Sequence, residues 1–176
     1  QKMLKKNILQ KLWLDNPSAR PPAYPHQLWN RKAAVLEIVG KWNEAEEIYR
    51  TSLEWAQANG DRMTIADGQN SLGNIVRLQG HYIQALSLFE EAYKASSELD
   101  NKHGIWTSLI NMGTVYFNQG LYQKAMDCYR INIGITEELG DRHKSGKTYL
   151  MMGNIYLFQG EYPRALEYYQ KSLSVF

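Results

Sequence analysis

The chain has 176 residues, of which 44% are hydrophobic and 12% aromatic, and its 20 basic and 18 acidic side chains leave a net charge of +2. This apolar content excludes an intrinsically disordered chain, and the balanced charge lacks the basic footprint of a nucleic-acid-binding protein. The single cysteine, Cys128, cannot form an internal disulfide and is typical of a reducing compartment, so we expect a cytoplasmic protein. We expect no membrane association, because no apolar run approaches the length of a membrane span.

Residues 1–16 begin the chain with an amphipathic pattern. Leu4, Ile8 and Leu12 recur at helical spacing while the lysines lie largely on other faces, which predicts a helix over residues 2–14. Prolines then keep residues 17–25 extended as a linker. The predicted helix could belong to an upstream domain, cap the remainder of the chain or occupy a groove in it. The chain lacks an initiator methionine and stops within a predicted helix, as expected of a protein fragment.

Residues 26–176 contain four copies of one pattern, with a period of 40 residues. The copies span about 26–60, 61–100, 101–140 and 141–176, and the last one is truncated. Three columns keep the step throughout: Gly40, Gly80, Gly120 and Gly160; Ala45, Ala85, Ala125 and Ala165; and Tyr49, Phe89, Tyr129 and Tyr169. A fixed period indicates one supersecondary unit that stacks on its neighbours.

Turn signals divide each copy into two helices. Glycine at position 40, 80, 120 or 160 suits the left-handed residue that closes a helix. Between copies, Gly60-Asp61, Asp100-Asn101 and Gly140-Asp141 each supply a helix stop followed by an N-cap. We therefore predict an all-α superhelical solenoid of about four helix-turn-helix repeats, preceded by the N-terminal helix.

The motif inside each copy resembles the tetratricopeptide repeat. Met112-Gly113, Tyr116, Ala125 and Tyr129 follow the family's L-G-x2-Y…A-x3-F core. The family's common period is about 34 residues, so the additional residues lengthen the helices beside the turn between repeats. The chain is most similar to the long-helix variety found in bacterial signalling regulators and animal spindle-orientation adaptors.

Small residues at fixed positions predict close helix packing. Gly73, Gly113 and Gly153 recur inside the first helices, where glycine costs about 1 kcal/mol relative to alanine. We expect these glycines to admit the second helix, and the aromatic column at 89, 129 and 169 to fill the space between neighbouring repeats. Both columns are interpreted as core.

Catalytic and metal chemistry find little support in the sequence. No phosphate loop, nucleophile elbow or zinc pattern is present. His103 and His143 occupy equivalent places in consecutive repeats, which are too far apart to share a metal ion. Cys128 has no histidine at helical spacing and is interpreted as a buried structural thiol. We expect neither an enzyme nor a bound cofactor or metal.

The resemblance implies a concave surface that is lined by the first helices and binds peptides. A helical wheel centred on Gly73 places Asn70, Asn74 and Arg77 on this side. Equivalent positions in the next two repeats add Thr114, Phe117, Asn118, Lys147, Asn154 and Phe158. Amides among apolar side chains suit an extended peptide. Because Asn74 faces this groove, we expect its replacement by alanine to cost little stability. One subtype of the family binds the terminal carboxylate of chaperone tails with lysine and asparagine side chains from successive first helices. Here the lysine positions are Asn70, Ile110 and Leu150, which argues against this subtype.

We therefore predict a protein-interaction scaffold that binds a peptide or helical segment of a partner. Alternatives are a spacer or dimerisation arm of a larger signalling protein, and a peptide-sensing regulator. In the last helix, Leu166, Tyr169, Leu173 and Phe176 form an apolar stripe. We expect this stripe to pair two copies through the C-terminal repeat or to be covered by the N-terminal helix.

Overall fold

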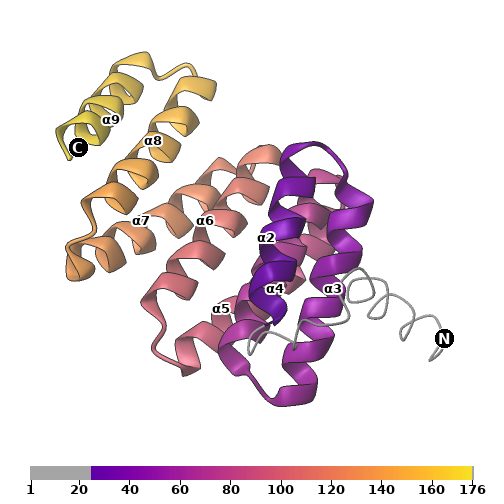
Figure 1. Cartoon of the computed structure of the whole chain (residues 1–176). Helices are drawn as coiled ribbons and strands as arrows, with labels where there is room; N and C mark the ends of the chain where they lie inside the picture. Colours follow the sequence, from indigo (N-terminus) through magenta and orange to yellow (C-terminus); the bar gives the residue numbers. More distant parts are fainter. Residues whose placement is uncertain (1–24, 176) are drawn as a thin grey trace.

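The computed structural model describes residues 25–175, which form eight α-helices joined by short turns and contain no strand (Figure 1). The predicted all-α class is confirmed. The N-terminal segment 1–16 with its predicted helix, and most of the linker, lie outside the described residues, and residue 25 already begins the first described helix. The helices are α2 (Pro25–Ile38), α3 (Trp42–Asn59), α4 (Arg62–Leu78), α5 (Tyr82–Glu98), α6 (Lys102–Asn118), α7 (Tyr122–Leu139), α8 (Arg142–Phe158) and α9 (Tyr162–Ser174).

The turns are built as the sequence predicts. Gly80 has a φ of 86° and Gly120 a φ of 74°. Both lie in the left-handed region, which residues other than glycine rarely adopt. Between hairpins, the side chains of Asp61, Asn101 and Asp141 each accept a hydrogen bond from the backbone N–H three residues later. These bonds satisfy donors that a helix start otherwise leaves unpaired.

Within each hairpin, an aromatic ring lies directly on the glycine of the first helix. A Cβ added at Gly113 would lie 2.3 Å from the Tyr129 ring, and one added at Gly73 would lie 2.6 Å from the Phe89 ring. The glycines are therefore required for close packing, as predicted. The prediction for the aromatic column was incomplete, because Phe89 and Tyr129 fill space inside their own repeats as well as between repeats.

Successive hairpins stack through a second column of apolar residues. Ile75, Val115 and Ile155 lie on the first helices α4, α6 and α8, and each is at most 1% exposed. Val115 belongs to the same apolar cluster as Ala85 and Phe89, which come from the second helix of the preceding hairpin. The hairpins thus follow one another from α2/α3 to α8/α9 across the view in Figure 1. No helix within residues 25–175 is both long and apolar enough to cross a bilayer.

The apolar stripe predicted on the last helix is only partly exposed. Leu166 is 61% and Leu173 is 74% exposed. Tyr169, in contrast, is half-buried, because its ring lies against Gly153. Phe176 lies outside the described residues. Tyr169 therefore belongs to the aromatic column of the hairpin core, as predicted for residues 89, 129 and 169, and not to the exposed stripe.

Candidate functional site

One groove collects side chains from the first helices of all four hairpins. It has a volume of about 420 Å³, within the range of small-molecule sites. Helices α4 and α6 contribute most of the lining, and α2, α3 and α8 close its ends. Its lining residues are Glu37, Tyr49, Asn70, Ser71, Asn74, Arg77, Thr107, Ile110, Asn111, Thr114, Lys147 and Met151.

A hydrogen-bonded chain of three side chains joins α2 to α4 along one wall of the groove. The Arg77 guanidinium donates to the Asn74 side-chain oxygen from both Nε and Nη2, at 3.2 and 2.7 Å. The Asn74 amide in turn donates to the Glu37 carboxylate. Because Asn74 uses both its oxygen and its nitrogen within the protein, its main role in the unliganded groove is to hold Glu37 and Arg77 in place.

Burial perturbs the charged groups of this chain. It raises the pKa of Glu37, although Arg77 and the hydrogen bonds from Tyr49 and Asn74 oppose the shift. Burial also lowers the pKa of Arg77, against the attraction of Glu37. The pKa of Tyr49 rises to about 12, first through burial and then through the nearby Glu37 carboxylate. The three groups therefore form one partly desolvated polar cluster.

Asn70 occupies the floor of the groove rather than its open face. Its side chain is only 4% exposed, and its amide donates to the Ser108 hydroxyl at 3.0 Å. No donor within the described residues reaches its side-chain oxygen, which is covered. A buried amide oxygen without a partner is costly, so the Asn70 oxygen is a free acceptor at the floor of the groove.

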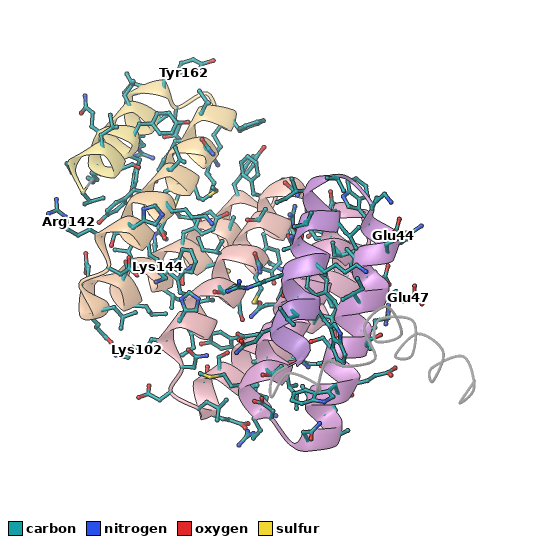
Figure 2. The ribbon with its side chains drawn as sticks, in the orientation of Figure 1. Glu44, Glu47, Lys102, Arg142, Lys144 and Tyr162 are labelled. Atoms are coloured by element: carbon teal, nitrogen blue, oxygen red, sulfur yellow. The ribbon has the colours of Figure 1, made fainter. Side chains whose placement is uncertain are left out.

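The other end of the groove combines a cation with apolar side chains. The Lys147 ammonium lies 5.3 Å from the centre of the Trp106 ring. Lys144, which is labelled in Figure 2, lies over the same ring at 5.6 Å. Ile110 and Met151 provide the neighbouring apolar surface. This end can accept an apolar side chain while Lys147 remains available to an acidic group.

Five of the nine residues predicted for the groove line it together: Asn70, Asn74, Arg77, Thr114 and Lys147. The other four lie elsewhere. Phe117 and Phe158 pack edge-to-face on each other with ring centres 5.0 Å apart, at the ends of α6 and α8. Asn118 is exposed at the end of α6, and the Asn154 side-chain oxygen accepts a hydrogen bond from the Tyr169 hydroxyl at 2.8 Å.

The sequence reasoning missed several lining residues. Glu37 belongs to the degenerate first repeat, but it stands 40 residues before Arg77 and could have been found from the period. Ser71, Asn111 and Met151 form a further column at the same step, one residue beyond Asn70. Comparing columns across all four repeats would have identified both sets.

The remaining candidate chemical groups do not line the groove. Cys128 is buried, as predicted, and burial raises the pKa of its thiol to about 11. His103 stacks on Trp106 with ring centres 6.4 Å apart. Within residues 25–175, no three histidine, cysteine or carboxylate side chains are grouped so as to hold a metal ion.

Comparison with known families identifies the fold. A family model described as tetratricopeptide repeat matches residues 25–98 and 105–176. The chain belongs to the tetratricopeptide repeat family. Its repeats form the kind of scaffold on which this family builds protein interactions. Among curated protein sequences, none matches the chain at a significant level.

Solved structures share this fold at low sequence identity. Aspartyl phosphate phosphatase F from Bacillus subtilis matches 86% of the chain with a TM-score of 0.79 and 16% identity. BtubC from P. vanneervenii matches 99% with a TM-score of 0.75 and 17% identity, and RapI matches 85% with a TM-score of 0.72 and 18% identity. The chain spans only 40% of phosphatase F and 42% of RapI, but 71% of BtubC. At these identities the likeness establishes the fold alone.

Proposed function

We propose that the chain is an interaction module without catalytic activity, and that its groove binds an extended peptide or a helical segment of a partner protein. The observation that carries this function is the convergence of all four first helices on one groove. Amides and hydroxyls can satisfy the backbone of a bound segment, while Ile110 and Met151 can accept its side chains.

The charges of the groove favour a segment with an acidic side chain. Glu37, Arg77 and Lys147 are the charged residues of the lining, so cations are in excess. The Arg77 guanidinium has five N–H donors. Two of them, one on Nε and one on Nη2, bind Asn74. Its remaining donors can bind a carboxylate, and charge-assisted bonds of this kind are among the stronger ones in proteins.

Selection from a random peptide library on the full chain would test this function. The affinity of the selected peptides for the wild-type chain would be measured by isothermal titration calorimetry, together with the variants Arg77→Gln and Lys147→Gln. Each variant should bind at least about tenfold more weakly, because a hydrogen bond to a charged group contributes about 1.5–3 kcal/mol.

Lys94→Gln is the matched control, since Lys94 is exposed on the second helix α5, outside the groove lining. Its affinity should equal that of the wild-type chain. Selected peptides that bind all four proteins equally would place the binding surface elsewhere.

A second candidate function is self-association through α9. Tyr162 lies at the outer edge of the last hairpin (Figure 2), and Tyr162, Leu166 and Leu173 are each more than 60% exposed. Burying such side chains contributes about 1.5–3 kcal/mol each, so a second copy is a suitable partner for this face. Sedimentation equilibrium should show a dimer that Leu173→Asp dissociates. A monomeric wild-type chain at all accessible concentrations would exclude this function.

A further inference from the structure

The first helix, α2, has an apolar face that no described element covers. Leu28 is 58%, Val35 59% and Val39 61% exposed. Leu28 and Val35 are seven positions apart on α2, and Val39 follows four positions later in the turn that ends the helix, so the three form one stripe. An exposed aliphatic stripe of this kind usually marks a surface that has a partner.

The internal repeat identifies what kind of element belongs on this stripe. Forty and eighty residues after Val35 are Ile75 and Val115, which are fully buried, and Leu28 likewise corresponds to the buried Gly68 and Ser108. In those repeats the second helix of the preceding hairpin covers the column. A Cβ added at Gly68, for example, would touch the Leu53 side chain of α3 at 3.4 Å. The α2 stripe is therefore the packing surface for a helix that directly precedes the first repeat, and we call this surface the α2 seat.

We propose that residues 2–14 occupy this seat and cap the solenoid, and that they do not lie in the groove. Their sequence predicts a helix with Leu4, Ile8 and Leu12 on one face. They also precede α2 in the chain, as each second helix precedes the next first helix. Residues 15–24 can span up to about 33 Å, whereas packed helices are only about 8–10 Å apart. The connection is therefore long enough.

A tethered segment has an advantage over a separate occupant. Its effective concentration at α2 is in the millimolar range for a short linker, so a modest apolar contact is sufficient to hold it. On this face, Lys32 occupies the position that the buried Leu72 occupies in the next repeat, 40 residues later. Its aliphatic stem can still lie along an apolar partner while the ammonium remains in solvent.

Hydrogen–deuterium exchange on the full chain tests this seat. Amides of residues 2–14 should be protected in the wild-type chain, independently of protein concentration. Val35→Asp and Leu28→Asp should each raise the exchange rate of residues 2–14 at least about tenfold. This factor corresponds to the free energy of burying one aliphatic side chain. Reciprocally, Ile8→Asp should raise the exchange of α2.

Ile83→Asp is the matched control, because Ile83 is 85% exposed on α5 and should leave residues 2–14 unchanged. Unaltered protection of α4–α9 verifies that each variant is folded. Free exchange of residues 2–14 in the wild-type chain would overturn the assignment, as would protection that Val35→Asp does not change. Protection that appears only at high concentration would identify a second copy as the occupant and would also overturn it.

Discussion

The contact between Gly113 and the Tyr129 ring makes a substitution as small as Gly113→Ala disruptive. The added Cβ would lie 2.3 Å from one ring carbon and 2.8 Å from the next, whereas carbon atoms pack at about 3.5–4.0 Å. Tyr129 is 1% exposed, so its ring cannot move aside without displacing other core side chains. Either the ring or the whole of α7 must shift by more than an ångström.

Two opposing effects set the magnitude. Alanine in a helix interior is favoured over glycine by about 1 kcal/mol, while overpacking of a core typically costs about 1–3 kcal/mol. Since this overlap is severe, we expect a net loss of about 2 kcal/mol. For a chain of this size the midpoint of thermal unfolding, followed by circular dichroism, should fall by roughly 4–8 °C.

Gly134→Ala provides the control within the same protein. Gly134 lies inside α7, and an added Cβ there would meet no atom within 4 Å. This substitution should raise stability by up to about 1 kcal/mol through helix propensity alone. If Gly113→Ala stabilises the chain as Gly134→Ala does, the ring does not pack on the glycine and the account of the hairpin core is wrong.

Three further predictions concern the groove wall and a helix cap. Asn74→Ala should lower the free energy of unfolding by about 1–2 kcal/mol in urea titrations, because Asn74 joins α2 to α4 and its loss leaves partly buried polar groups unpaired; an unchanged urea midpoint would instead support the small cost expected from sequence. Burial raises the pKa of Glu37 above 4.5, so the Glu37 carboxyl binds its proton more tightly in the folded state than in the unfolded chain. The stability that this protonation contributes is lost as pH rises through the pKa of the folded state. Glu37→Gln should therefore gain stability relative to wild type between pH 4.5 and neutrality, and a pH-independent difference in urea midpoint would contradict this sign. Asp141→Ala removes the N-cap of α8 and should cost about 1 kcal/mol, measured as the same urea midpoint; a cost within error of zero would mean that this cap does not contribute.

The sequence predicts those features that repeat. Gly73, Gly113 and the aromatic residues sixteen positions after them recur with a fixed period, and each column has one physical reason in every copy. The cap residues Asp61 and Asp141 were predictable for the same reason, since a helix start needs the same acceptor wherever it occurs.

The groove was less predictable because it depends on contacts between repeats. A helical wheel assigns Asn74 and Asn154 to the same face, but neighbouring side chains give them different roles: Asn74 bridges Glu37 and Arg77, whereas Asn154 binds Tyr169. Tyr169 also shows that apolar periodicity alone does not distinguish an outer stripe from the packing surface inside a hairpin. Those assignments require the stacking geometry of the helices.

The central claim is that the first helices, and not the second ones, bind the partner. Chemical-shift mapping with a peptide selected on the full chain tests it most directly. We predict that the largest perturbations fall on backbone amides of the groove lining, at Asn74, Thr114 and Lys147, while α5 and α7 change little. Chemical-shift perturbations that concentrate on α5, α7 or α9, with unchanged shifts of the groove amides, would contradict the account.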